Sequence, residues 1–83
     1  MNKQRRKALT ALLDDASDLA SSAANLQSRI EEIRDEEQEA FDAMPEGLQA
    51  NSTAEEAINN LESAIDILDA LICFTDYIET AME

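Results

Sequence analysis

The sequence predicts an all-α protein: a two-helix antiparallel hairpin of the coiled-coil type, which dimerises into a four-helix bundle. Apolar residues recur with 3-4 spacing along two long stretches, which is the pattern of a heptad seam. The only proline and the only glycine of the 83 residues, Pro45 and Gly47, stand together between these stretches. The second stretch is apolar over more of its circumference than a single partner helix covers.

The first stretch predicts a helix from about residue 3 to residue 43. No glycine or proline interrupts it, and at 1.5 Å per residue it is about 60 Å long. The count of three and four continues to Glu37, a polar residue that interrupts the seam. The apolar seam residues before it are Leu9, Leu12, Ala16, Leu19, Ala23, Leu26, Ile30 and Ile33.

The chain reversal is predicted at residues 44–52. Pro45 disfavours helical geometry in the residue before it and cannot extend the helix behind it. Gly47 permits a positive φ angle. We expect Leu48 to fold back over the end of the first seam near Phe41.

The second helix is predicted from about residue 53 to residue 82. Ser52 with Glu55, or Thr53 with Glu56, offers a capping box at its start. Its seam again alternates three and four residues. The seam residues are Ala54, Ala57, Leu61, Ala64, Leu68, Leu71, Thr75, Ile78 and Met82.

Two features of these helices predict an oligomer, most simply a dimer. An extra row of isoleucines lies beside the second seam, whereas a hairpin needs only one seam. The second helix is also the shorter one, so at equal rise Met82 reaches only about the level of Ala16. The leucines before that point then need cover from another subunit or a partner. The expected oligomer interface comprises Leu9, Leu12, Leu13, Ile58, Ile65 and Ile72.

The composition argues against catalysis and against bound cofactors. Without histidine there is no imidazole acid, base or metal ligand, and one glycine cannot build a phosphate-binding loop. Carboxylates such as Glu36 and Glu39 alone predict at most weak cation binding. We therefore expect no enzyme, no cofactor and no metal site. The lone Cys73 stands beside the apolar face and is expected to be buried filler.

No segment predicts secretion or membrane insertion. The apolar run that follows the first basic residues, 8–13, is shorter than a secretory signal requires, and no apolar run is long enough to span a bilayer. The unpaired Cys73 suits a reducing compartment. We expect a cytoplasmic protein.

The formal net charge of −13 hides an asymmetry. Four of the six cations, Lys3, Arg5, Arg6 and Lys7, lie in the first seven residues, and after Arg34 the sequence has 14 acids and no base. Such a body repels nucleic acid and anionic lipid and attracts basic surfaces. Direct nucleic-acid binding is therefore not expected. The simpler alternative is that the acids only keep a small helical protein soluble.

The strongest candidate for a partner-binding site is the acidic turn cluster, at the end of the first helix and in the reversal. It combines six carboxylates with an aromatic anchor, a side-chain type that binding hot spots favour. The alternative for Phe41 is that it merely plugs the end of the helix pair. The cluster comprises Asp35, Glu36, Glu37, Glu39, Phe41, Asp42, Met44 and Glu46.

The segment EEQEAFDAMPEGLQ at residues 36–49, followed by AEEAINNLESAID at residues 54–66, resembles small acidic helical-hairpin proteins of bacteriophages and prophages. The resemblance covers about residues 30–70. That group has no settled activity, so what the resemblance implies is a viral origin and a bacterial host cell. Many small viral proteins inhibit host factors or antiviral defence, and this analogy suggests an inhibitor.

Two functional hypotheses follow from the sequence. In the first, a small acidic viral protein binds and inhibits a host protein, plausibly a component of antiviral defence, by occupying a basic surface. In the second, an oligomeric helical scaffold or small-ligand sponge of phage origin forms its platform or pocket between subunits. A salt-dependent pull-down separates them, because only the first predicts a basic protein partner.

Overall fold

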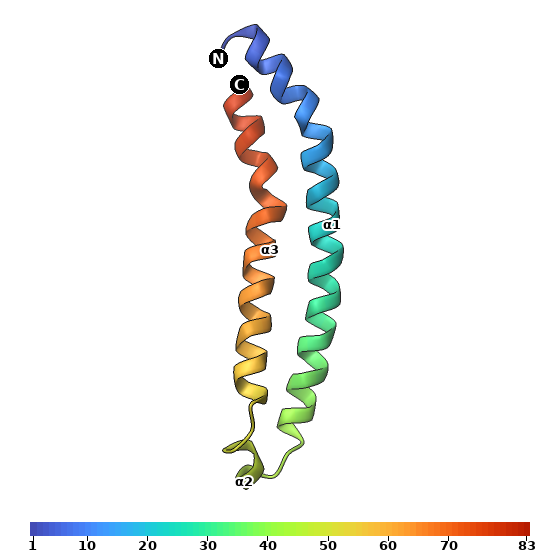
Figure 1. Ribbon diagram of the computed structural model, residues 1–83, viewed down its shortest axis with the longest axis vertical. Helices are drawn as coiled ribbons and strands as arrows, with labels where there is room; N and C mark the ends of the chain where they lie inside the picture. The colour runs from blue at the N-terminus through green and yellow to red at the C-terminus, as the bar shows by residue number, and fades with distance from the viewer.

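The computed structural model describes all 83 residues, and its regular structure is entirely helical, which confirms the predicted all-α class. The helices are α1 (Lys3–Asp42), α2 (Glu46–Gln49) and α3 (Ala54–Met82). Helices α1 and α3 lie side by side and run in opposite directions, and α2 lies in the turn between them (Figure 1). The Cα atoms span 64 × 17 × 14 Å. The molecule is therefore a thin rod with both termini at one end (Figure 1).

Helix α1 begins and ends with the signals that its sequence carries. The Asn2 side chain accepts a hydrogen bond of 2.8 Å from the Arg5 amide, which satisfies one of the free N–H groups at the helix start. No glycine or proline follows for 40 residues. The helix stops at Asp42, three residues before Pro45, in keeping with the geometry that proline imposes on its neighbours.

The turn differs from the sequence-based expectation. Pro45 is extended, and residues after it form the short helix α2, so Gly47 lies within a helix and has no positive φ. Proline suits the start of such a helix because its fixed φ is already helical and its missing N–H is not needed there. The expectation for Leu48 was wrong, because it is 60% exposed and does not cover the end of the first seam.

The start of α3 is also capped differently from the prediction. Thr53 makes no side-chain capping bond, and neither predicted capping box forms. Instead the Ser52 hydroxyl oxygen accepts a hydrogen bond of 3.0 Å from the amide of Ala54, two residues on. Such short side-chain-to-backbone bonds are an alternative that serine offers to a regular cap. Glu55 and Glu56 remain in the first turn, where the helix dipole favours acids.

The buried core is small and one-sided. Only Ala16, Ala23, Ala54, Ile58 and Ile65 are buried. Of the two apolar rows of α1, the row with Ala16 and Ala23 therefore faces α3. The other row points outward, and the predicted seam, which combined both rows, needs correction.

The expected oligomer row of isoleucines lies inside the contact between α1 and α3. Ile58 and Ile65 are buried, and Ile72 is half-buried. The buried residues on the opposing helix are alanines, whose small volume leaves room for branched side chains. The isoleucine row is therefore the main apolar part of α3 that packs against α1 within one chain. It is not left over to form an oligomer interface.

Gln27 fixes the two helices against each other. Its side-chain amide donates hydrogen bonds to the Ile65 carbonyl at 3.0 Å and to the Asp69 carboxylate at 3.2 Å. Gln27 is half-buried, so its polar group is satisfied where water has limited access.

The first turns of α1 are partly covered within the chain. These turns lean toward the C-terminal end of α3 (Figure 1), and Leu9 and Leu13 are half-buried. The expectation that Leu9, Leu12 and Leu13 all lack intrachain cover is therefore wrong for the first and third. Only Leu12 is exposed, at 55%. The bend of α1 shortens the gap that the two helix lengths predicted.

Candidate functional site

The acidic turn cluster is formed by the last two turns of α1 and the start of α2. All six carboxylates fall in this region, and all except Glu37 are exposed. Because one continuous helix carries five of them, successive turns place the acids on several sides of the rod end. The structure therefore brings together the acids that the sequence singled out.

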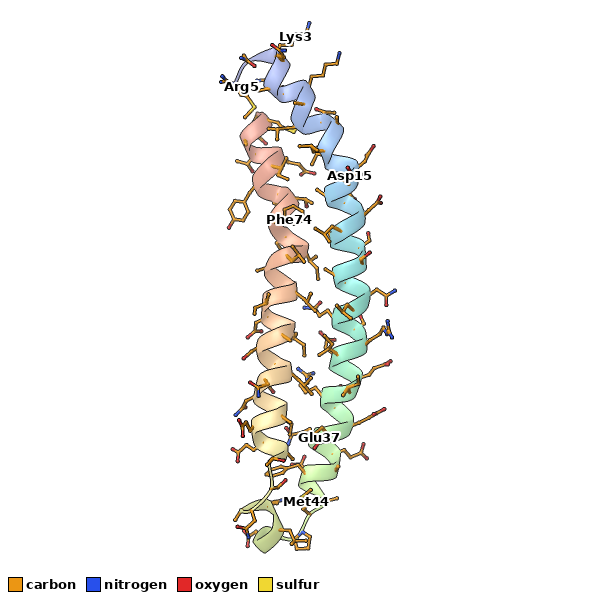
Figure 2. The ribbon with its side chains drawn as sticks, viewed as in Figure 1. Lys3, Arg5, Asp15, Glu37, Met44 and Phe74 are labelled. Atoms are coloured by element: carbon orange, nitrogen blue, oxygen red, sulfur yellow. The ribbon has the colours of Figure 1, made fainter.

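Glu37 behaves differently from its neighbours. It continues the α1 row that faces α3 and is half-buried (Figure 2). A carboxylate in that row keeps contact with water at the edge of the helix pair, while its stem packs against the apolar side. Glu37 therefore belongs to the helix contact as well as to the cluster, and it is a poor choice for testing binding alone.

The cluster has little internal charge compensation. The one salt bridge of the structure joins Arg34 and Asp35, which are neighbours in the sequence of α1, at 3.0 Å. Asp42 accepts a hydrogen bond of 3.0 Å from the Gln38 amide, which is neutral. The other carboxylates of the cluster make no ion pair. The rod end therefore presents a concentrated negative field.

Phe41 and Met44 stand where α1 ends and the turn begins. Both side chains are half-buried. The Gln49 side-chain amide donates to the Phe41 carbonyl at 2.9 Å and to the Met44 carbonyl at 3.1 Å. The Phe41 carbonyl also accepts from the Met44 amide at 3.1 Å, so Gln49 adds a second donor there and supplies the donor for the Met44 carbonyl just beyond α1. Half-burial fits both readings of Phe41, as a plug and as a partly accessible anchor.

Sequence reasoning missed the role of Gln49. Glutamine is not a standard C-capping residue, and no spacing rule predicts a side chain of α2 that reaches back to α1. The only available signal was its position, a few residues beyond a proline that ends a long helix.

The basic residues lie at the opposite end of the rod. Lys3 and Arg5 are near the N-terminus, and Met44 marks the acidic end (Figure 2). Lys3, Arg5, Arg6 and Lys7 are exposed, and none of them forms a salt bridge within the chain. The cations therefore lie at the end of the rod opposite the acidic turn cluster, where the C-terminal end of α3 also brings Glu79 and Glu83. They form no ion pair with these acids within the chain.

No pocket is present, and no three histidine, cysteine, aspartate or glutamate side chains gather in a way that can hold a metal ion. Cys73 is exposed, so the expectation of a buried filler was wrong. None of the helices combines the length and the apolar character needed to cross a membrane.

Comparisons of the chain with protein-family models, with curated proteins and with solved structures found no match.

Proposed function

We propose that the protein acts by recognition: its acidic turn cluster binds a basic surface of a host protein and thereby inhibits that protein. The observation that carries this proposal is the exposed, almost unpaired set of carboxylates at one end of the rod. Acids that served solubility alone would need neither this concentration nor the lack of any base after Arg34.

The physical basis is electrostatic steering followed by apolar anchoring. Uncompensated carboxylates attract a basic surface over about 8–10 Å at physiological ionic strength, and steering of this kind mainly raises the association rate. The half-buried Phe41 and Met44 then supply apolar contact area beside the charges. The viral and inhibitory parts of the proposal rest on the resemblance of residues 30–70 to small phage proteins, and they place the interaction in the bacterial cytoplasm.

The experiment compares two variants that remove the same charge from different places. The cluster variant carries Glu36→Gln, Glu39→Gln and Glu46→Gln, and it leaves the half-buried Glu37 intact. The control variant carries Glu62→Gln and Glu79→Gln on exposed positions of α3 and Glu83→Gln at the exposed residue that follows this helix. Glutamine is nearly as good a helix former as glutamate, so both variants should keep the helicity of the natural chain.

The immobilised proteins are then used to capture partners from a bacterial lysate, and bound proteins are eluted with salt. A basic protein that binds the natural chain and the control variant but not the cluster variant supports the proposal, and its association rate should depend steeply on salt. Equal capture by the two variants contradicts it, as does the absence of any salt-eluted basic protein.

A second function is favoured by a different observation. An exposed row of large aliphatic side chains on α1 indicates assembly, as expected of a helical scaffold or of a small-ligand sponge whose pocket lies between subunits. This alternative predicts binding that does not depend on the charge of the cluster. The same pair of variants therefore separates the two functions.

We also propose that the antiparallel pair of α1 and α3 is a coiled-coil-like hairpin that persists in solution, and that two such hairpins form a four-helix bundle. Support comes from the small core of the single chain, which buries only five residues. Chains of this size have little apolar burial to spare and often gain stability by oligomerising.

A further inference from the structure

The largest apolar feature on the surface is a straight row along α1. We call it the leucine row, and its members follow one another at intervals of seven residues. They are Leu12 (55% exposed), Leu19 (50%), Leu26 (46%) and Ile33 (54%). Because a strict seven-residue period persists over four heptads, the row matches another helix rather than an irregular partner.

Helix α3 contributes a second apolar row beside the leucine row, on the same side of the rod. On α1 the leucine row lies three residues after the buried row of Ala16 and Ala23. On α3 the residues three positions after Ala54 and its heptad equivalents are Ala57, Ala64, Leu71 and Ile78. In two antiparallel helices that face each other through equivalent heptad rows, equal offsets turn toward the same side of the pair. One face of the rod is therefore apolar along most of its length.

The size of the exposed surface suits a second copy of this chain. The accessible surface is 6239 Å², whereas a compact protein of 9.2 kDa exposes about 4,900 Å². The excess of about 1,300 Å² exceeds the roughly 800 Å² that each partner buries in an interface of standard size. A Cα radius of gyration of 19.1 Å, against about 12 Å for a compact chain of this length, shows where the excess lies. It is spread along the rod.

We propose that this face is the dimer interface, and that two chains pack with α1 antiparallel to the partner's α1. The two-fold axis is perpendicular to the rod and passes between the two copies of α1, at the level of Ser22 and Ala23. This register places Leu12 against the partner's Ile33 and Leu19 against the partner's Leu26. Small residues at 20–24 surround the axis and let the helices approach closely. The proposal specifies the bundle proposed above and does not depend on the binding of a host protein.

Charge selects this orientation over the alternative. A two-fold axis along the rod would bring two acidic turn clusters to one end and two sets of cations to the other. The antiparallel register instead sets Lys3 level with the partner's Asp42 and Arg6 level with the partner's Glu39. Charges of opposite sign then lie within screening distance at both ends of the bundle, whereas the alternative would oppose like charges.

The register also predicts a specific flanking pair. Asp15 and Arg29 occupy the row next to the leucine row, on the side away from α3, and both are exposed without an ion pair in the single chain. In the antiparallel dimer Asp15 comes beside the partner's Arg29, and symmetry repeats the contact. Ser22 of the same row then lies beside the partner's Ser22.

The first test is the molar mass in solution, measured by sedimentation equilibrium on the full chain. We expect a dimer with a Kd below about 100 µM. Leu19→Gln with Leu26→Gln should weaken it about 100-fold, because four half-exposed side chains of the dimer lose their apolar contact. The control Leu48→Gln alters a leucine of α2 that is 60% exposed and should leave the Kd unchanged. A natural chain that stays monomeric overturns the proposal, and so does a dimer that tolerates the double variant.

The orientation is tested by charge reversal. Asp15→Arg and Arg29→Asp should each weaken the dimer about fivefold, because each places two like charges together. The double reversal should restore the dimer, and an equimolar mixture of the two single variants should form a heterodimer. Failure of both rescues overturns the antiparallel arrangement, even if the dimer depends on the leucines.

A crosslinking measurement checks the position of the axis. In a chain with Cys73→Ser, Ser22→Cys should crosslink rapidly to its copy through a short bis-maleimide. Ser21→Cys lies at the same level, but it points away from the interface and should not be crosslinked under the same treatment. Equal crosslinking of both variants contradicts the proposed register.

Discussion

The clearest prediction on stability concerns two isoleucines that stand two residues apart on α3. Ile65 is 9% exposed and packs against α1, whereas Ile67 is 70% exposed. Ile65→Ala and Ile67→Ala remove the same atoms from the same helix. The two variants differ only in the side of α3 from which the atoms are removed. The pair therefore isolates the contribution of the contact between the helices to the free energy of unfolding.

The magnitude follows from the burial. Isoleucine to alanine removes three carbon groups, each worth about 0.8 kcal/mol when buried, and a remaining cavity adds to that loss. Alanine returns about 0.4 kcal/mol through its better helix propensity. Ile65→Ala should therefore cost about 2 kcal/mol, and Ile67→Ala less than about 0.5 kcal/mol. A chain of 83 residues has a total stability of about 4–12 kcal/mol, so the first loss is large.

The assay is urea unfolding, followed by circular dichroism of the helix signal. The protein is kept dilute so that assembly does not add to the stability. With a slope of about 1 kcal/mol per molar urea, the two midpoints should differ by about 1.5–2 M. Equal midpoints would refute the packing of α3 on α1 through the isoleucine row. A larger loss for Ile67→Ala would reverse the side of α3 that faces α1.

Two further predictions concern the turn and the thiol. Gln49→Ala should lower the free energy of unfolding by about 1 kcal/mol, because the Met44 carbonyl loses its donor and the Phe41 carbonyl keeps only the Met44 amide. Asn51→Ala, which removes one exposed bond to Gly47, is the control in the same urea titration, and an equal loss would contradict the capping role. The exposed Cys73 should react with a thiol reagent as fast in the native protein as in urea, and protection in dilute native protein would contradict its placement.

The fold class could be predicted because its signals are local. Two heptad patterns and a long stretch without glycine or proline predict helices, and Pro45 ends the first of them. These signals depend on backbone geometry and hydrophobic periodicity, which a single sequence displays. The short helix α2 was missed because four residues give no periodicity to detect.

The rotation of the helices about their own axes could not be predicted in the same way. Both apolar rows of α1 have the same hydrophobic pattern, so periodicity does not say which row faces α3. The choice depends on volume: α1 turns its alanines inward, such as Ala16 and Ala23, against the branched Ile58 and Ile65. Size complementarity between two helices is a tertiary property, and it sends the leucines outward.

The grouping of the six acids could be predicted because all of them fall between Asp35 and Glu46, and a helix keeps residues that are near in sequence near in space. Their role in binding stays a prediction. The separate behaviour of Glu37 depends on the rotation of α1 and therefore escaped the prediction in the same way as the leucine row. Its position was visible as a polar residue within a seam. Whether such a residue faces the neighbouring helix or the solvent is decided only when the packing is known.

The two proposals constrain each other through the position of the charges. In the antiparallel dimer the four cations at residues 3–7 of each chain lie near the acidic turn cluster of the other chain. The cluster has six carboxylates, so the acids outnumber these cations. Each end of the bundle therefore stays negative, but a basic partner must compete with a basic segment that is already present. Competition of this kind raises specificity, because only a surface more basic or better shaped than the segment can displace it. The dimer would thus set the threshold for partner binding at the same end of the rod where the acids provide the attraction.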